Sequence, residues 1–251
     1  MPLSDRLSRA TAVPQRQMGE YLRQLDADSL WRTLAQPSRE TLLQEGRIIP
    51  VLAGENIQQQ GEAASGLIYI LCGLFHLTIL DSNGNQMLLH IAQRGVWLGS
   101  NSLLDEAPPI SNTVSAAPGA IFYVPATAIT KLMRSDADIA LFLGRLTAVN
   151  LRGLLQRTFE NATLSSHALI AQLLMHLAGE IWKADANQKQ PVLQITQEEL
   201  SSMCGLSRKT ISRTLQSMKR KGILKIEYNA ITILQRETLS SLSQTGESVE
   251  F

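Results

Sequence analysis

The fold is decided by residues 195–227, which read ITQEELSSMCGLSRKTISRTLQSMKRKGILKIE. Thr196 precedes an apolar-periodic run and Glu199 follows three residues later, which is a capping box and predicts the start of a helix. Gly205 comes where the chain must turn sharply, and glycine adopts a positive φ at the least cost. Ser207 can accept a backbone N–H and so predicts the start of a second helix. The pattern indicates two short helices joined by a tight turn.

The second helix has two chemically different faces. Apolar residues recur at i, i+4 and i+7 and predict its buried face: Ile211, Leu215 and Met218. The opposite face carries Arg208, Lys209, Ser212, Arg213 and Gln216. The seven cations from Arg208 to Lys225 have no Asp or Glu among them, and they are Arg208, Lys209, Arg213, Lys219, Arg220, Lys221 and Lys225. A positive field of this density attracts phosphates.

A wing follows the second helix in the sequence. Gly222 comes after the cationic last turn and is typical of a helix end. The runs Ile223–Lys225 and Ala230–Leu234, which reverse near Tyr228 and Asn229, predict two paired strands. The whole segment is therefore interpreted as a winged helix-turn-helix whose partner is double-stranded DNA. The alternative for the basic helix alone is an ordinary solvated helix.

Bulk composition limits the class of protein. The chain has 251 residues and a formal net charge of +1, so two domains are expected and the basic charge is local. Cys72 and Cys204 stand far apart among apolar residues, which predicts buried core residues rather than a disulfide or a metal pair. No apolar run approaches the roughly 18 residues that span a bilayer, and residues 1–10 lack a signal-peptide core. A cytoplasmic protein with no membrane partner is expected.

The predicted fold class is α+β, with an antiparallel β-roll first and the winged helix-turn-helix last. Short β-rich runs separated by glycines fill the region from Arg47 to about Tyr123, and Asp81–Asn85 is a hairpin turn signal. One long helix without proline follows. The expected domains are a leader at 1–26, a sensor-like roll at 27–134, a dimerisation helix at 135–164, the DNA-binding domain at 165–240 and a tail at 241–251.

The long helix has features of a dimer interface. The large residues Ile139, Leu143, Leu151 and Leu155 are expected on it, and Ala140, Gly144 and Ala148 recur every four residues and would let two backbones approach closely. A second stripe, Phe142, Leu146 and Val149, is expected to pack on the roll. The competing interpretation is a single helix buried on all sides. A dimer is preferred, because a helix-turn-helix protein needs two binding domains if its DNA site is palindromic.

A β-roll, a long helix and a winged helix-turn-helix together resemble the CRP/FNR (cAMP receptor protein/fumarate-nitrate regulator) family of bacterial transcription factors. The resemblance covers roughly residues 30–238. GENIQQQGEAASGLIYILCGLFHL is similar to the family's opening β-roll and ITQEELSSMCGLSRKTISRTLQSMKRKGIL to its DNA-binding motif. The resemblance implies a cyclic-nucleotide-binding-like jelly roll, a homodimer joined along the long helix, and a two-fold symmetric DNA site. It also implies RNA polymerase as a partner of an activator, although no residue here identifies that contact.

The resemblance assigns roles within the DNA-binding motif. Arg208, Ser212 and Arg213 match base-reading positions of the family, and arginine suits a bidentate contact with guanine. Lys209 matches a further base-reading position where many members carry glutamate. Lysine cannot accept a hydrogen bond from a cytosine amino group, so a different preferred base pair is expected there. The expected phosphate contacts are Thr196, Ser207, Thr210 and Lys221.

The effector positions of the family are degenerate in this chain. Ser100 stands where cAMP-binding members carry glutamate, and Ile110-Ser111 stands where they carry Arg-Ser. No Lys or Arg lies between Arg94 and Lys131, so a buried cyclic phosphate would find no counter-charge. Leu154 and Leu155 replace the adenine contacts on the long helix. Binding of cAMP is therefore not expected.

Other cofactors and functions have weaker support. Residues 1–50 contain no cysteine, which argues against the iron–sulfur centre of the oxygen-sensing branch. A haem ligand would have to come from one of four scattered histidines, His76, His90, His167 and His176. An apolar effector near Leu151, Leu154 and Leu155, or no effector, is the remaining expectation, and no metal is predicted. Neither a phosphate loop nor a nucleophile motif indicates an enzyme. A protein-binding scaffold with a vestigial winged helix stays as an alternative.

Overall fold

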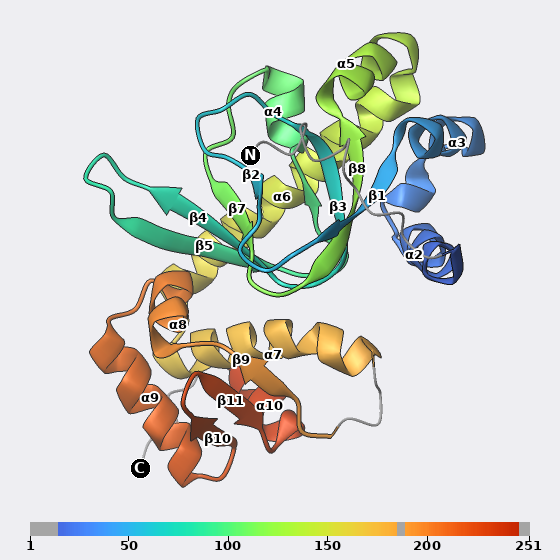
Figure 1. Cartoon of the computed structure of the whole chain (residues 1–251). Helices are drawn as coiled ribbons and strands as arrows, with labels where there is room; N and C mark the ends of the chain where they lie inside the picture. The colour runs from blue at the N-terminus through green and yellow to red at the C-terminus, as the bar shows by residue number, and fades with distance from the viewer. Residues whose placement is uncertain (1–14, 185–188, 246–251) are drawn as a thin grey trace. The chain divides into compact units, whose positions relative to one another are not determined.

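The computed structural model describes residues 15–184 and 189–245 and falls into two units that divide between Arg152 and Gly153. Figure 1 shows an antiparallel β-roll, the long helix α6 (Ala137–Thr163), and a C-terminal group of helices with a small sheet. The predicted α+β class and the order of its parts are confirmed. The ends of the predicted leader and tail, 1–14 and 246–251, lie outside the described residues.

The roll pairs two antiparallel sheets, with the strand orders β1-β8-β3-β6 and β2-β7-β4-β5. Their strands are β1 (Arg47–Val51), β2 (Asn56–Gln58), β3 (Gly66–Cys72), β4 (Phe75–Leu80), β5 (Gln86–Ala92), β6 (Trp97–Leu98), β7 (Asn112–Ser115) and β8 (Gly119–Pro125). The hairpin turn expected at Asp81–Asn85 joins β4 to β5. The Asp81 carboxylate accepts hydrogen bonds from the backbone N–H groups of Asn83 and Asn85 at 2.8 Å. Hydrogen bonds from Asn85 and then Asn83 lower the pKa of Asp81.

Strand β3 is buried on both faces, which explains its nearly continuous apolar sequence. Ile68 and Ile70 point between the two sheets and pack with Phe75. Leu67, Tyr69 and Leu71 point to the other side, where helices cover the sheet. The covering helices of the first unit are α2 (Gln15–Ala27), η1 (Trp31–Thr33), α3 (Gln36–Glu45), α4 (Ser100–Asp105), α5 (Ala126–Ser135) and the first half of α6.

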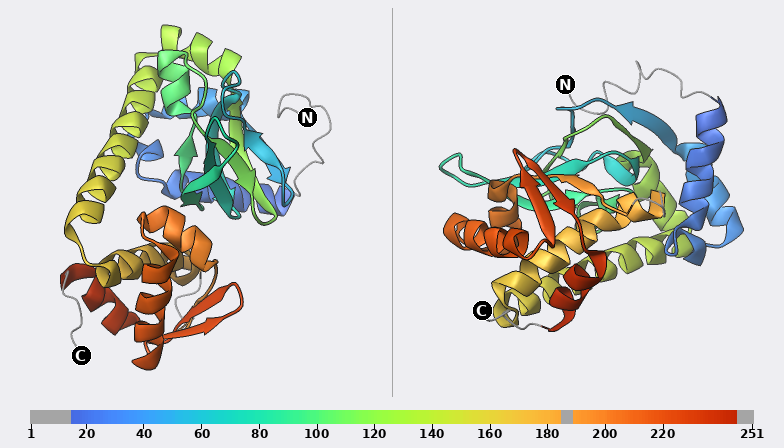
Figure 2. Two further views of the ribbon diagram at one scale, coloured as in Figure 1. Left: turned by 90° about the vertical axis from the view of Figure 1, so that its left-hand side faces the viewer. Right: turned by 90° about the horizontal axis from the view of Figure 1, so that it is seen from below.

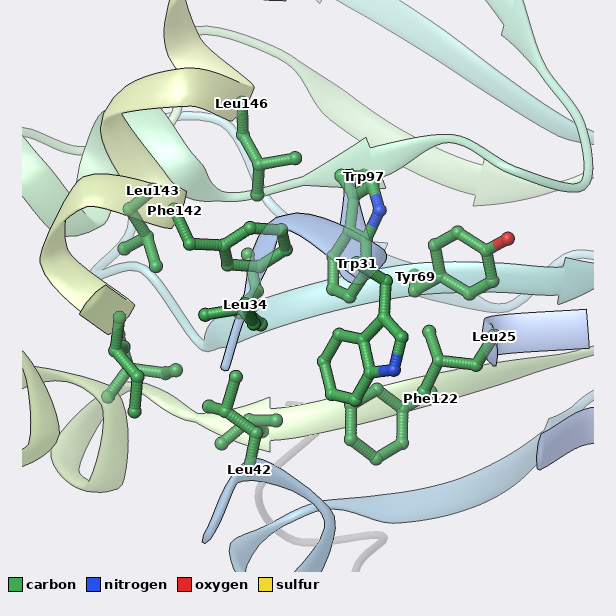
Figure 3. Packing of buried hydrophobic residues seen from close by; sticks show 14 of the residues in the cluster. Leu25, Trp31, Leu34, Leu42, Tyr69, Trp97, Phe122, Phe142, Leu143 and Leu146 are labelled. Atoms are coloured by element: carbon green, nitrogen blue, oxygen red, sulfur yellow. The ribbon is translucent and has the colours of Figure 1, made fainter. Parts of the chain in front are cut away.

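An aromatic cluster joins α6 to the roll (Figure 3). Trp31 stacks on Trp97 with ring centroids 5.9 Å apart, and Phe142 of α6 meets the Trp97 ring edge-on at 5.2 Å. Aromatic pairs in these geometries stabilise a core beyond their area burial. Leu25 of α2 belongs to the same buried cluster, so the described part of the predicted leader contributes to the core of the roll. This cluster decides which face of α6 is turned inward.

The second unit consists of α7 (Ser166–Ala184), β9 (Val192–Gln194), α8 (Gln197–Cys204), α9 (Arg208–Arg220), β10 (Leu224–Glu227), β11 (Ala230–Ile233) and α10 (Arg236–Thr245). The predicted wing is β10 and β11, to which β9 adds a third strand in the order β10-β11-β9. The predicted domain end at 240 falls inside α10, which packs on α7 and buries Leu242. Among the described helices, none combines the length and apolar character that crossing a bilayer requires.

Candidate DNA-binding site

The first helix of the motif, α8, begins at the predicted capping box. The Thr196 hydroxyl accepts a hydrogen bond from the Glu199 backbone N–H at 3.1 Å. The Glu199 carboxylate in turn accepts from the Thr196 backbone N–H at 2.7 Å and from its hydroxyl at 2.9 Å. The two residues thus satisfy backbone donors that a helix start leaves open.

The turn between α8 and α9 uses the two predicted residues. Gly205 adopts φ +63°, a left-handed conformation that costs most residues free energy and costs glycine little. Ser207 lies just before α9, and its hydroxyl accepts from the Thr210 backbone N–H at 3.1 Å. The start of α9 is therefore held by a local side-chain cap, which fixes where the exposed face of the helix begins.

Helix α9 buries one face and exposes the other. Ile211, Leu215 and Met218 are buried as expected, and Thr214 and Ser217 are buried beside them. The predicted base-reading residues Arg208, Lys209 and Arg213 are exposed on the other side, together with Gln216, while Ser212 is half-buried between them. The fold thus places the four predicted base-reading side chains on the outward side of one helix, which is the element that enters the major groove in helix-turn-helix proteins.

The predicted phosphate contacts are arranged around that helix. The hydroxyls of Ser207 and Thr210 lie 2.9 Å apart, and Thr196 belongs to the cap of α8. Lys221 is exposed at the C-terminal end of α9. The three hydroxyls already have local partners, so their structural role in capping and turn formation is established by the geometry. A phosphate contact would be an additional role for the same atoms.

The fold brings an acidic residue to the basic face that the pattern along the chain did not indicate. Glu198, in the first turn of α8, forms an ion pair with the guanidinium of Arg208. Both side chains remain about two-thirds exposed, at 68% and 69%. Glu198 stands in the first turn of a helix, where acidic residues are favoured. Its pairing was not predictable from local spacing, because the partners lie ten residues apart on different helices.

Helix α7 packs against α9. The Ser166 hydroxyl lies 3.2 Å from the Thr214 hydroxyl. The neighbouring His167 has a buried Nε2 atom with no hydrogen-bond partner. Burial, followed by the positive charges of Lys221 and Arg213, lowers the pKa of His167. The sequence presented His167 as one of four scattered histidines, and the structure places it against the basic helix.

The six predicted effector positions differ in how far they are exposed. Ser100 and Ser111 are buried in the roll, whereas Ile110 is 73% exposed. The Ser100 hydroxyl lies 3.3 Å from the Thr147 hydroxyl of α6, which donates the hydrogen bond. Gly99 precedes Ser100 with φ +91°, where a Cβ would come within 2.3 Å of the Gly66 carbonyl oxygen. The α6 leucines of the prediction, Leu151, Leu154 and Leu155, are exposed.

The predicted dimer face of α6 requires a correction. Ile139 and Leu143 are fully buried against the roll of their own chain, because they share the inward face with Phe142 and Leu146. They cannot contact a second copy. Ala140, Gly144 and Ala148 are only half-buried and Leu151 is exposed, so they remain accessible. Val149, expected to pack on the roll, is exposed.

Comparison with known proteins gives the family. Residues 169–242 match the Crp-like helix-turn-helix domain, and residues 48–136 match the cyclic nucleotide-binding domain. The chain belongs to the CRP/FNR family of transcriptional regulators. This CRP/FNR regulator is 24% identical over 198 residues to the cAMP-activated global transcriptional regulator CRP of Pasteurella multocida. The matched region covers 78% of this chain and 94% of the relative. The chain is 25% identical over 191 residues to the cyclic AMP receptor protein of Thermus thermophilus, covering 76% and 85%.

Solved structures share the fold of this CRP/FNR regulator. FixK2 of Bradyrhizobium japonicum has 18% identity and a TM-score of 0.66, covering 80% of this chain and 98% of that one. The c-di-GMP responsive regulator CLP of Xanthomonas campestris has 16% identity and a TM-score of 0.63, covering 80% and 100%. The relative in Pasteurella multocida is cAMP-activated and CLP is c-di-GMP responsive, so membership in the family does not identify the effector of this chain. No group of three His, Cys, Asp or Glu side chains that could hold a metal occurs within residues 15–184 and 189–245.

Proposed function

We propose that this regulator is a homodimer that binds a palindromic site in double-stranded DNA and does not take cAMP as its effector. The observation that carries the proposal is α9. Its start is capped, its apolar face is buried, and its outward face carries Arg208, Lys209 and Arg213. A basic helix held in this way fits the major groove, which admits an α-helix and presents a distinct pattern for each base pair.

Sequence preference is assigned to the outward face of α9. Arg208 and Arg213 can each make a bidentate contact with guanine, and Ser212 can contact either kind of base edge. Lys209 offers donors and no acceptor, which favours base edges that accept hydrogen bonds. Thr196, Ser207, Thr210 and Lys221 are proposed to contact phosphates, which set the register of the protein on the duplex.

Dimer formation is assigned to a corrected stripe on α6. Figure 2 shows the first half of α6 along one flank of the roll. Exposed or half-buried apolar and small residues follow one another along α6 at spacings of three and four, which places them on one face of a helix. They are Leu141, Gly144, Ala148, Leu151, Leu155 and Phe159. Leu155 and Phe159 are 60% and 63% exposed, which is costly for large apolar side chains in water.

The roll is proposed not to bind cAMP. A cyclic phosphate buried beside Ser100 would have no cationic side chain from residues 95–130, because that stretch contains none. The Ser100 hydroxyl already has Thr147 as its partner.

Contact with RNA polymerase stays a prediction from the family. The proposed activity is binding, and no step of it requires catalysis.

The proposal is tested by selecting DNA from a random pool of duplexes with the full-length protein. The expected result is an inverted repeat whose half-sites lie about one DNA turn apart, roughly 34 Å. Arg208→Ala with Arg213→Ala should remove most of the preference, since each bidentate contact discriminates by about 1–3 kcal/mol. Lys131→Ala with Arg134→Ala removes two exposed cations from α5 and serves as the matched control. Equal affinity for every sequence at fixed salt would show that the proposal is wrong.

A further inference from the structure

The carboxylate of Glu198 is the feature of the DNA-binding surface that the proposed function leaves unexplained. Two adjacent glutamates stand in the first turn of α8, and the fold uses them differently. Glu199 turns back to Thr196 and completes the capping box. Glu198 points away from the cap and pairs with Arg208, the first residue of α9. A helix start needs one carboxylate for its capping box, so Glu198 is not required for it.

The ion pair is too exposed to be explained by stability. Both side chains keep about two-thirds of their surface in water. Ion pairs at this level of exposure are screened by solvent and salt and contribute little to folding. The ion pair therefore mainly affects Arg208 itself. It holds the Arg208 guanidinium beside a negative charge at the start of the exposed face of α9.

We infer that Glu198 is a specificity-determining positioning residue for Arg208, an inference that rests on the proposed function. A carboxylate at a DNA-binding surface is repelled by every phosphate, whatever the sequence. It therefore weakens the salt-dependent attraction that supplies nonspecific binding. A guanidinium has five N–H donors, and a bidentate contact with guanine uses two of them. The remaining donors can stay on Glu198, so the carboxylate opposes random phosphate contacts while it keeps the guanidinium oriented for a base.

The test measures the ratio of affinities for two duplexes, the site selected by the wild-type protein and a scrambled version of it, at one salt concentration. Glu198→Gln keeps the size of the side chain and removes its charge. The affinity for the scrambled duplex is expected to rise by about three- to ten-fold, the effect of about one phosphate contact, and the affinity for the selected site to rise less. The ratio of the affinity for the selected site to that for the scrambled duplex is therefore expected to fall, by at most the factor gained on the scrambled duplex.

Glu237→Gln is the matched control, because Glu237 is an exposed acid in the first turn of α10 in the same unit. It changes the net charge equally and should leave the ratio unchanged. In the Arg208→Ala background, Glu198→Gln should raise both affinities by the same factor. The inference is wrong if Glu198→Gln leaves the ratio at the wild-type value, or lowers it as much without Arg208 as with it. If the wild-type protein binds both duplexes with equal affinity, the proposed function is wrong, and the inference about Glu198 is wrong with it.

Discussion

At the scale of single residues, the surface of α9 combines predicted and unpredicted chemistry. Capping residues and exposed cations follow from local rules, because a cap or a helix face depends on neighbours within one turn. The neighbours of these cations on other helices do not follow from such rules. Glu198 and His167 illustrate this, since both reach α9 only through the packing of α7 and α8.

Lys209 carries a prediction about base preference. Lys209→Glu replaces three donors with an acceptor, so the preferred base pair at one position of each half-site should change to one that presents the cytosine amino group. The expected discrimination is about 1–3 kcal/mol in favour of the new base pair. Selection from the same random pool with both proteins measures the change. An unchanged preference at every position would remove Lys209 from the base-reading set.

His167 carries a prediction about pH. Burial and the charges of Lys221 and Arg213 disfavour its protonated form, so its pKa in the folded protein lies below 6.5. A depressed folded-state pKa gives a contribution to stability that is complete above pH 6.5 and is lost as pH falls through the folded-state value. The wild-type protein should therefore lose stability relative to His167→Gln on acidification.

Nuclear magnetic resonance titration of the histidine ring protons, assigned with the same variant, measures this pKa directly. Urea unfolding of both proteins at pH 7.5 and at pH 5 measures the consequence. A pKa at or above 6.5 would contradict the prediction, as would a difference in unfolding free energy that does not change with pH.

At the scale of elements, α6 has two apolar faces of different fates. Its inward face contributes to the aromatic cluster around Trp97, and its outward face carries the stripe from Leu141 to Phe159. The sequence predicted the long helix, but it expected Ile139 and Leu143 on the dimer face, whereas the roll buries them. Two apolar faces on one helix have the same periodicity, so the pattern alone cannot tell which of them the roll covers.

Leu151 and Asn150 provide a test of the stripe. They are adjacent and exposed, yet they lie on different sides of α6, since successive residues of a helix point about 100° apart. Leu151→Glu places a charge in the proposed interface and should shift the protein from twice 27.6 kDa to 27.6 kDa in sedimentation equilibrium. Asn150→Glu adds the same charge outside the stripe and should stay dimeric. A wild-type monomer, or equal self-association of both variants, would reject the stripe as an interface.

At the scale of the whole molecule, the fold does not identify the effector. The roll has the architecture of a cyclic nucleotide-binding domain, and its relatives include a cAMP-activated regulator. The side chains that a cyclic phosphate needs are a property of individual positions, and the family resemblance predicts Ser100 and Ile110 at those positions. A shared fold therefore supports DNA-binding regulation more strongly than it supports a particular ligand.

Thermal unfolding tests the absence of a cAMP response. A ligand at one hundred times its Kd stabilises the folded state by about 2.7 kcal/mol, which raises Tm by several degrees. Millimolar cAMP is expected to shift the Tm of this protein by less than about 1 °C. The cAMP-activated regulator of Pasteurella multocida serves as the positive control. A saturable rise of several degrees in this protein would show that the roll binds the nucleotide.

The sequence by itself determined the elements whose causes are local. The capping box at Thr196, the glycine turn at Gly205, the Ser207 cap and the Asp81 hairpin each depend on residues a few positions apart, so their patterns are visible along the chain. Only the tertiary structure decided which face of α6 is buried, that α10 extends the second unit beyond residue 240, and that Glu198 pairs with Arg208. These outcomes depend on contacts between residues that are distant in sequence or on different elements. Such contacts form only when the packing of the core has fixed the orientation of each element.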